Sequence, residues 1–193
     1  MGYRKQTILW AAALLTPVVG ARAQSQSGAA SATSPAAPAL GDMAPGFQAT
    51  ATDSSGRAIP VSLSDVRGKV VVLAFYPLDR SQGCTAELDK FRDEFSSMFG
   101  RDVVVWPTSV DTLASHASWA KEAHFPFAMI ADPQGQVARA YGSVTAGRPY
   151  FNRTVFVIGR DGRIAYEDLR FGALSEDAYR RLAAAITAAK AAQ

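Results

Sequence analysis

The apolar positions of this chain fall into runs with two different spacings. Residues 70–76 are apolar without interruption, which is typical of a central strand covered on both faces of a sheet. In residues 84–99, apolar side chains recur at intervals of three and four, at Leu88, Phe91, Phe95 and Met98. That spacing predicts a single helix with one buried stripe, and Gly100 directly after it is a typical helix end.

The rest of the pattern alternates between strand-like and helix-like segments. Strands are predicted at 102–106, 127–130, 153–158 and 164–167, and helices at 113–123, 136–141 and from Ser175 onward. Loose alternation at 47–52 before a turn at 53–56 predicts an N-terminal β-hairpin, and Asp161-Gly162 predicts a second hairpin. This order predicts an α/β protein with a thioredoxin-like fold, in which a central mixed β-sheet is flanked by helices.

The N-terminus has the composition of an export signal. Arg4 and Lys5 precede an apolar stretch at 7–19, and the segment 21–23 offers small residues where a signal peptidase would cleave. We therefore expect residues 1–23 to be a signal peptide and the protein to be exported, either periplasmic or secreted. The alternative is an uncleaved N-terminal anchor, although the stretch is shorter than the ~20 apolar residues that usually span a membrane.

Two further segments follow the signal. Residues 24–40 are rich in Ala, Ser and Pro without apolar periodicity, which predicts a flexible linker. Residues 41–193 are then expected to form one domain with a single hydrophobic core.

The net charge changes when the signal is removed. The whole chain has 20 basic and 17 acidic residues, and three of the basic ones (Arg4, Lys5 and Arg22) leave with the signal, so 17 basic residues remain against 17 acidic. That balance provides no basic footprint for nucleic acid or for an anionic membrane. We expect no nucleic-acid partner and no stable membrane insertion after cleavage.

Cys84 is the single cysteine of the chain, and its surroundings are unusual for a structural thiol. It follows the apolar run 70–76 and a short polar loop, at the point where the predicted helix begins. The free N–H groups and the positive end of a helix dipole favour a thiolate at such a position. An intramolecular disulfide is impossible, so any redox reaction of Cys84 has to be completed by another molecule.

The loop resembles the active-site loop of the peroxiredoxins, the AhpC/TSA superfamily. Residues 75–87 read Phe-Tyr-Pro-Leu-Asp-Arg-Ser-Gln-Gly-Cys-Thr-Ala-Glu, and the family pattern is Pro-x-x-x-Thr/Ser-x-x-Cys after a strand. The Gly-Cys-Thr-x-Glu continuation is most similar to the bacterioferritin-comigratory, or PrxQ-type, branch. Further similar blocks occur in order along the chain, at 41–47, 63–69, 109–116, 132–133 and 153–158.

The resemblance implies roles for five residues. Cys84 would be the nucleophile that reduces hydrogen peroxide or an organic hydroperoxide and becomes a sulfenic acid. The Ser81 hydroxyl would bind the peroxide, and Pro77 would shield the thiolate from water. Arg153 would hold the thiolate and stabilise charge on the leaving oxygen, and Glu87 would orient Arg153.

Each of these residues also has an ordinary structural interpretation. A lone cysteine is commonly a small buried hydrophobe, and Arg153 could belong to a surface ion pair. Ser81 could cap a helix, Pro77 could end a strand, and Glu87 could offset the helix dipole. The two histidines, His116 and His124, are expected to serve packing or solvent contacts only.

The chain departs from its branch in one respect. Many PrxQ-type enzymes carry a resolving cysteine five residues after the first, where this chain has Asp89. The resemblance therefore implies a one-cysteine mechanism, in which an external thiol or a thioredoxin-like protein reduces the sulfenic acid. It implies no cofactor and no metal, and it leaves a monomer or a homodimer open.

Three other functions remain to be weighed. An exported thiol-disulfide oxidoreductase normally needs Cys-x-x-Cys, which this chain lacks. A copper-binding, SCO-like accessory protein would need two cysteines and a histidine. A catalytically silent thioredoxin-fold binding module is compatible with the sequence, although the combination of Pro77, Ser81, Cys84 and Arg153 argues against it.

Overall fold

Seven strands form one mixed sheet in the computed structural model, which describes residues 1–2 and 36–192. The strands are β1 (Gln48–Thr52), β2 (Ala58–Ser62), β3 (Val70–Phe75), β4 (Val103–Ser109), β5 (Met129–Ala131), β6 (Thr154–Ile158) and β7 (Ile164–Asp168). Their order in the sheet is β2-β1-β5-β4-β3-β6-β7. The β3–β4 and β4–β5 pairs are parallel and the other pairs are antiparallel, so the predicted mixed sheet is confirmed.

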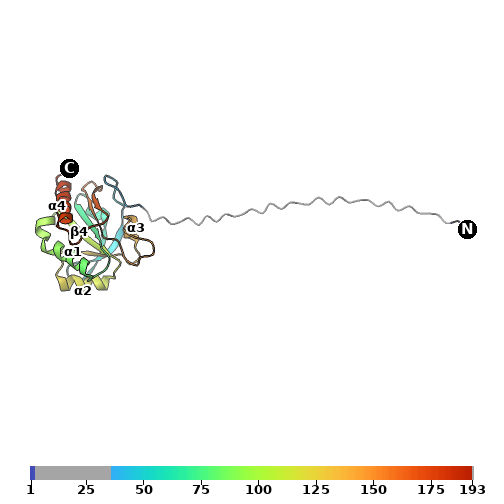
Figure 1. Cartoon of the computed structure of the whole chain (residues 1–193), viewed down its shortest axis with the longest axis horizontal. Coiled ribbons are helices and arrows are strands. Elements are labelled where there is room, and N and C mark those ends of the chain that lie inside the picture. Colours follow the sequence, from blue (N-terminus) through green and yellow to red (C-terminus); the bar gives the residue numbers. More distant parts are fainter. Residues whose placement is uncertain (3–35, 193) are drawn as a thin grey trace. The chain divides into compact units, whose positions relative to one another are not determined.

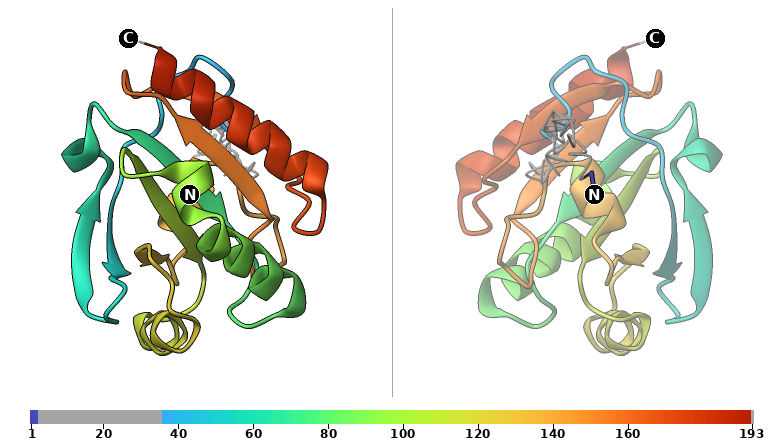
Figure 2. Two further views of the ribbon diagram at one scale, coloured as in Figure 1. Left: turned by 90° about the vertical axis from the view of Figure 1, so that its left-hand side faces the viewer. Right: turned by 90° about the vertical axis from the view of Figure 1, so that its right-hand side faces the viewer.

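Helices cover both faces of this sheet. The helices are α1 (Gln82–Asp93), α2 (Leu113–Ala123), α3 (Gln136–Ala140) and α4 (Glu176–Ala191), with a 3-10 turn η1 (Leu63–Val66) and a π-helical turn η2 (Phe95–Phe99). Helices α1, α2 and α4 contribute to the core on one face, and α3 contributes to the core on the other. Figure 1 shows α1 and α4 on one side of β4 and α3 on the opposite side. In the left view of Figure 2, where the side with α1 and α4 faces the viewer, α4 crosses in front of the sheet.

Strand β3 explains why the chain carries an uninterrupted apolar run. Val70, Val72 and Ala74 pack into one core, whereas Val71, Leu73 and Phe75 pack into the other. All six residues of the strand are buried, because neighbouring strands and helices on both faces enclose it. The loop that carries Cys84 therefore follows a strand that is buried along its whole length.

Both predicted hairpins are present. Strands β1 and β2 pair antiparallel, as do β6 and β7 on either side of the Asp161-Gly162 turn. Gly162 has φ +82, a conformation that glycine adopts without steric cost. Ser175 caps α4, because its side chain accepts a hydrogen bond from the N–H of Ala178.

Three sequence predictions differ from the structure by two residues or more. The strand expected at 102–106 is Val103–Ser109. The helix expected at 84–99 begins at Gln82 and ends at Asp93, and a π-helical turn follows. The wider turn buries Phe99 against Phe91, with ring centroids 5.3 Å apart, and leaves Phe95 only half-buried. The strand expected at 127–130 is β5, which begins at Met129 because only residues 129–131 pair with β1.

The predicted signal peptide at 1–23 and most of the linker lie outside the described residues. Ala37 and Pro38, which were assigned to the linker at 24–40, instead pack on the domain. Pro38 is buried. Ala37 lies close to Gly142, since a Cβ added at Gly142 would be 2.6 Å from the backbone nitrogen of Ala37. Within residues 1–2 and 36–192, no helix has the length and apolar character to cross a membrane.

Candidate active site

The loop between β3 and α1 carries the predicted site. Strand β3 ends at Phe75, and Pro77 lies two residues further along the chain. The N–H of Tyr76 still donates to the carbonyl of Thr108 at 3.0 Å, whereas Pro77 has no N–H to donate. Ser81 is the N-cap residue of α1, but its hydroxyl donates a hydrogen bond to the carbonyl of Leu78, 3.1 Å away, instead of capping the helix. The carbonyl of Ser81 accepts the N–H of Thr85 at 2.8 Å, which starts the helix.

Cys84 is the third residue of α1 and has 0% of its surface exposed. Its backbone N–H therefore belongs to the first turn, where helical N–H groups have no intrahelical partner. The side chain points to Arg153, whose Nη2 donates to the Cys84 sulfur at 3.2 Å. A guanidinium and a helix N-terminus thus both lie at this sulfur.

The pairing of two strands explains how Arg153 reaches Cys84 across 69 residues of sequence. Strands β3 and β6 run antiparallel, and the last residue of β3, Phe75, pairs with the first residue of β6, Thr154. Arg153 therefore precedes β6 at the same edge of the sheet from which the Cys84 loop departs. The N–H of Phe171 also donates to the Arg153 carbonyl at 3.1 Å, which fixes the backbone there.

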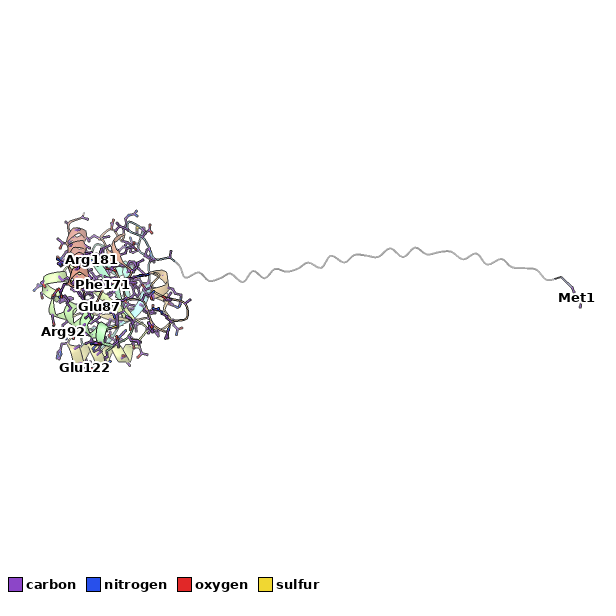
Figure 3. All side chains as sticks on the ribbon, viewed as in Figure 1. Met1, Glu87, Arg92, Glu122, Phe171 and Arg181 are labelled. Atoms are coloured by element: carbon purple, nitrogen blue, oxygen red, sulfur yellow. The ribbon has the colours of Figure 1, made fainter. Side chains whose placement is uncertain are left out.

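Glu87 lies one turn after Cys84 and is completely buried. Its Oε2 accepts a hydrogen bond from Arg153 Nη1, while its Oε1 has no hydrogen-bond partner among the described residues. Figure 3 labels Glu87 within the body of the domain. Burial raises the pKa of Glu87 to about 7, against the opposing effect of the Arg153 charge and hydrogen bond.

The charges of the three groups are coupled through Arg153. Burial lowers the pKa of Arg153, but the nearby Glu87 and Cys84 outweigh this effect and raise it overall. Near neutral pH, Glu87 is therefore partly protonated, and the guanidinium charge is only partly neutralised by its carboxylate. The remaining positive charge is available to the Cys84 sulfur and to negative charge that develops beside it.

A hollow of about 550 Å³ opens beside this group and is lined by both Pro77 and Arg153. Its other walls come from residues 145–152 and 169–171, which include apolar Tyr150, Phe151 and Leu169 and basic Arg148 and Arg170. Pro77 and Arg153 thus border a space larger than a peroxide group needs.

Among the five predicted residues, the structure brings Cys84, Glu87 and Arg153 into direct contact. Pro77 borders the hollow with Arg153. Ser81 is half-buried three residues before Cys84, and its one side-chain hydrogen bond in the described part of the chain is the bond to Leu78. Its hydroxyl oxygen keeps its acceptor lone pairs.

Sequence reasoning missed Gly83 and the function of His116. A Cβ on Gly83 would lie 3.2 Å from Arg153 Nη2, so glycine permits the close approach of the guanidinium. His116 was expected to serve packing or solvent contacts, yet its side chain is 0% exposed and both ring nitrogens have polar partners. One of these partners is Asp79 of the active-site loop, which sequence reasoning did not connect to His116. His124 is exposed at the end of α2.

Within the part of the chain that the structure describes, no group of three or more His, Cys, Asp or Glu side chains could hold a metal ion. His116 instead faces Asp79 and the carbonyl of Ile130, and Cys84 faces Arg153.

A buried thiol at a helix start, held by an arginine on a thioredoxin-like sheet, defines the class of thiol peroxidases. Residues 40–167 match the model of the AhpC/TSA family. The chain is 34% identical over 113 residues to peroxiredoxin Bcp of Bacillus subtilis, covering 55% of this chain and 72% of that protein. It is 38% identical over 93 residues to the chloroplastic peroxiredoxin Q of Sedum lineare, covering 48% of this chain and 49% of that protein.

The comparison of structures agrees. The crystal structure of Enterococcus faecalis AhpC superposes with a TM-score of 0.70 at 26% identity, covering 80% of this chain and 96% of that one. The chain therefore belongs to the AhpC/TSA family, as a peroxiredoxin similar to the Bcp and peroxiredoxin Q branch.

Proposed function

We propose that this protein is a one-cysteine thiol peroxidase that reduces hydrogen peroxide or organic hydroperoxides through a sulfenic acid on Cys84. The observation that carries the proposal is the hydrogen bond from Arg153 Nη2 to the Cys84 sulfur at 3.2 Å. A positive, partly buried donor at this sulfur favours the nucleophilic thiolate, and it can also stabilise negative charge on the oxygen that leaves.

The oxidation step is a two-electron displacement. The Cys84 thiolate attacks one peroxide oxygen, so that an S–O bond forms while the O–O bond breaks. The sulfur becomes a sulfenic acid that keeps the peroxide proton, and the other oxygen leaves as hydroxide or alkoxide. That oxygen then takes a proton from solvent to give water or an alcohol. Ser81 would bind the peroxide, Pro77 would exclude water, and Glu87 would orient Arg153.

The second half of the cycle requires another molecule. Asp89, at the position where related enzymes carry a resolving cysteine, is paired with Arg92 at 2.7 Å. An external thiol would attack the sulfenic sulfur and release water, leaving a mixed disulfide. A second thiol would then attack the mixed disulfide, restore the Cys84 thiol and leave the reductant as a disulfide. We propose a small thiol or a thioredoxin-like protein as this reductant.

The hollow beside Arg153 supports organic hydroperoxides as substrates in addition to hydrogen peroxide. Its volume of about 550 Å³ accommodates an organic group, and Tyr150, Phe151 and Leu169 provide apolar contacts. Substrate preference is measured by comparing the second-order rates of Cys84 oxidation by hydrogen peroxide and by cumene hydroperoxide.

We further propose that the protein is exported to the periplasm or secreted after cleavage at residue 23, and that it acts as a monomer or homodimer. The basic start, apolar stretch and small residues at 21–23 support export. N-terminal sequencing of the protein recovered from a host expressing the full chain tests this. A mature protein that begins at Gln24 is expected, and retention of Met1 in the cytosol would contradict it.

The central experiment is peroxide consumption by the purified domain with dithiothreitol as reductant. Wild type should consume peroxide catalytically, and one equivalent of peroxide should leave a sulfenic acid on Cys84 that dimedone traps. Cys84→Ser should abolish both results. Equal turnover by the two proteins would reject the proposed function, as would the absence of a dimedone adduct in wild type.

A further inference from the structure

A buried polar cluster lies under the active-site loop, and the peroxidase chemistry described above does not use it. We call Tyr76, Asp79, Ser115 and His116 the Asp79 cluster. The Asp79 carboxylate accepts hydrogen bonds from the Tyr76 hydroxyl at 2.7 Å, the Ser115 hydroxyl at 2.5 Å and His116 Nδ1 at 3.0 Å. The side chain of Asp79 is only 4% exposed, so these bonds replace nearly all of its contact with water.

Both ring nitrogens of His116 have polar partners. Nδ1 faces the Asp79 carboxylate at 3.0 Å and the Tyr76 hydroxyl at 3.4 Å, and Nε2 faces the carbonyl oxygen of Ile130 at 3.2 Å. Burial raises the pKa of Asp79, but the bonds from His116, Ser115 and Tyr76 outweigh it and hold that pKa below its usual value. Asp79 and His116 are therefore a buried, hydrogen-bonded pair.

This buried pair connects the active-site loop to α2. Asp79 lies in the loop between Pro77 and Ser81, whereas Ser115 and His116 lie in the first turn of α2. The Asp79 N–H also donates to the Asp111 carboxylate at 2.8 Å, just before that helix. Arg80 forms a second connection to α2, through Glu122 at 2.9 Å, but it is exposed and its backbone has φ +59. The buried connection is the stronger of the two, since water weakens an exposed ion pair.

The two halves of the proposed cycle place opposite demands on this loop. A small peroxide reacts while Pro77 and Arg153 border the hollow together and while Arg153 contacts the sulfur. A reductant thiol has to bring a bulkier group to the same sulfur, which has no exposed surface. Attack by an external thiol therefore requires the loop and the first turn of α1 to move away.

We propose, on the basis of the one-cysteine function above, that Asp79 and His116 are positioning residues that hold the active-site loop closed. The closed loop speeds the oxidation of Cys84 and slows the reduction of its sulfenic acid. Weakening the bond between Asp79 and His116 changes the two rates in opposite directions. A purely structural role would slow both half-reactions or leave both unchanged.

The test measures the two half-reactions separately in Asp79→Asn, which keeps the size of the side chain and removes its charge. Oxidation by hydrogen peroxide should slow by about ten- to a hundred-fold, because small displacements of reacting groups carry penalties of that size. Reduction of the preformed sulfenic acid by excess dithiothreitol should become several-fold faster. Hydrogen exchange at residues 77–84 should also increase, whereas exchange within β3 should not.

Glu122→Gln is the matched control, because it breaks the exposed ion pair between Arg80 of the loop and α2. Glu122 lies at the edge of the domain in Figure 3, and its side chain is 67% exposed. Both rates should stay within about two-fold of wild type, as expected for an exposed ion pair. Tyr76→Phe removes one hydroxyl bond to Asp79 and keeps the ring, so it provides a milder variant should Asp79→Asn fail to fold. It should shift both rates in the same directions by a smaller factor.

Parallel slowing of both half-reactions in Asp79→Asn and in Tyr76→Phe would overturn the proposal, as would unchanged rates in both. Rescue provides a further criterion. The double variant Asp79→Asn/His116→Gln replaces both partners by amides that can bond to each other, so it should recover stability without recovering the oxidation rate. If wild type itself fails to consume peroxide, the proposed function fails; if only the opposite shifts are missing, the positioning role alone fails.

Discussion

Arg153→Ala provides the most direct test of the active-site geometry. The guanidinium lies 3.2 Å from the Cys84 sulfur, and its side chain is only 18% exposed. At that distance and an effective dielectric constant near 20, the attraction between the guanidinium and a thiolate is about 5 kcal/mol before solvent replaces it. Removal of one preorganised donor from a developing oxyanion slows other enzymes by about 10²- to 10³-fold. We expect Cys84 oxidation to slow by about the same factor.

The assay is a competition for limiting hydrogen peroxide between the variant and horseradish peroxidase, which yields the second-order rate of Cys84 oxidation. Arg148→Ala is the matched control, because Arg148 borders the same hollow and has no hydrogen bond to Cys84 among the described contacts. Its rate with hydrogen peroxide should stay within about two-fold of wild type.

Loss of Arg153 also leaves Glu87 buried without its partner, and that effect has to be separated from catalysis. The double variant Arg153→Ala/Glu87→Gln removes the carboxylate as well, so it should recover folding stability while its oxidation remains slow. An Arg153→Ala protein that folds and reacts with peroxide within about two-fold of wild type would refute the reasoning, because the measured contact would then contribute nothing to the transition state.

Three further predictions concern residues around the same helix. Burial raises the pKa of Glu87 from 4.5 to about 7 in the folded protein. Between these pH values the folded form keeps a proton that the unfolded chain releases, so the free energy of unfolding falls as pH rises. Urea denaturation should show wild type losing about 3 kcal/mol relative to Glu87→Gln across that window, and parallel pH curves would contradict this. Gly83→Ala should slow the oxidation of Cys84 by peroxide about ten-fold, because the added Cβ would lie 3.2 Å from Arg153 Nη2 and displace a side chain that Glu87 restrains. An unchanged rate would show that the arginine adjusts freely. Leu88→Ala, at a fully buried position, should lower the free energy of unfolding by about 3–5 kcal/mol in urea titrations, and a loss below about 1 kcal/mol would mean that the core closes over the gap.

The sheet could be predicted in large part from the sequence because its signals are local. The unbroken apolar run at 70–76 required burial on both faces, and β3 indeed contributes alternate residues to two cores. The Asp161-Gly162 turn likewise required a hairpin. The π-helical turn at Phe95–Phe99 had no such signal, because its apolar spacing also fits an ordinary helix. Packing against Phe91 decides between the two forms, and packing depends on the whole fold.

The candidate site likewise combines residues that are close in sequence with residues that only the fold brings together. Pro77, Ser81, Cys84 and Glu87 lie within eleven residues of one another, so their association follows from one loop and one helical turn. Only the family resemblance connected Arg153 to them, because its position depends on the antiparallel pairing of β3 and β6. The contact of His116 with Asp79 was not anticipated at all. It joins α2 to the loop across 37 residues, and nothing in the local pattern of either segment indicates it.

The register between β3 and β6 has a consequence for how this protein can tolerate insertions and deletions. A shift of one residue in β6 would move Arg153 by about 3.3 Å along the strand and would exchange the two faces of every residue that follows. A single-residue insertion in β6 would therefore either unpack two cores or remove the guanidinium from Cys84, depending on which side of the insertion keeps its pairing with β3. The exposed segment at 145–149 lies just upstream and can change length without altering that register. Variation among natural relatives should accordingly appear as altered length there, with the strand spacing to Arg153 kept constant.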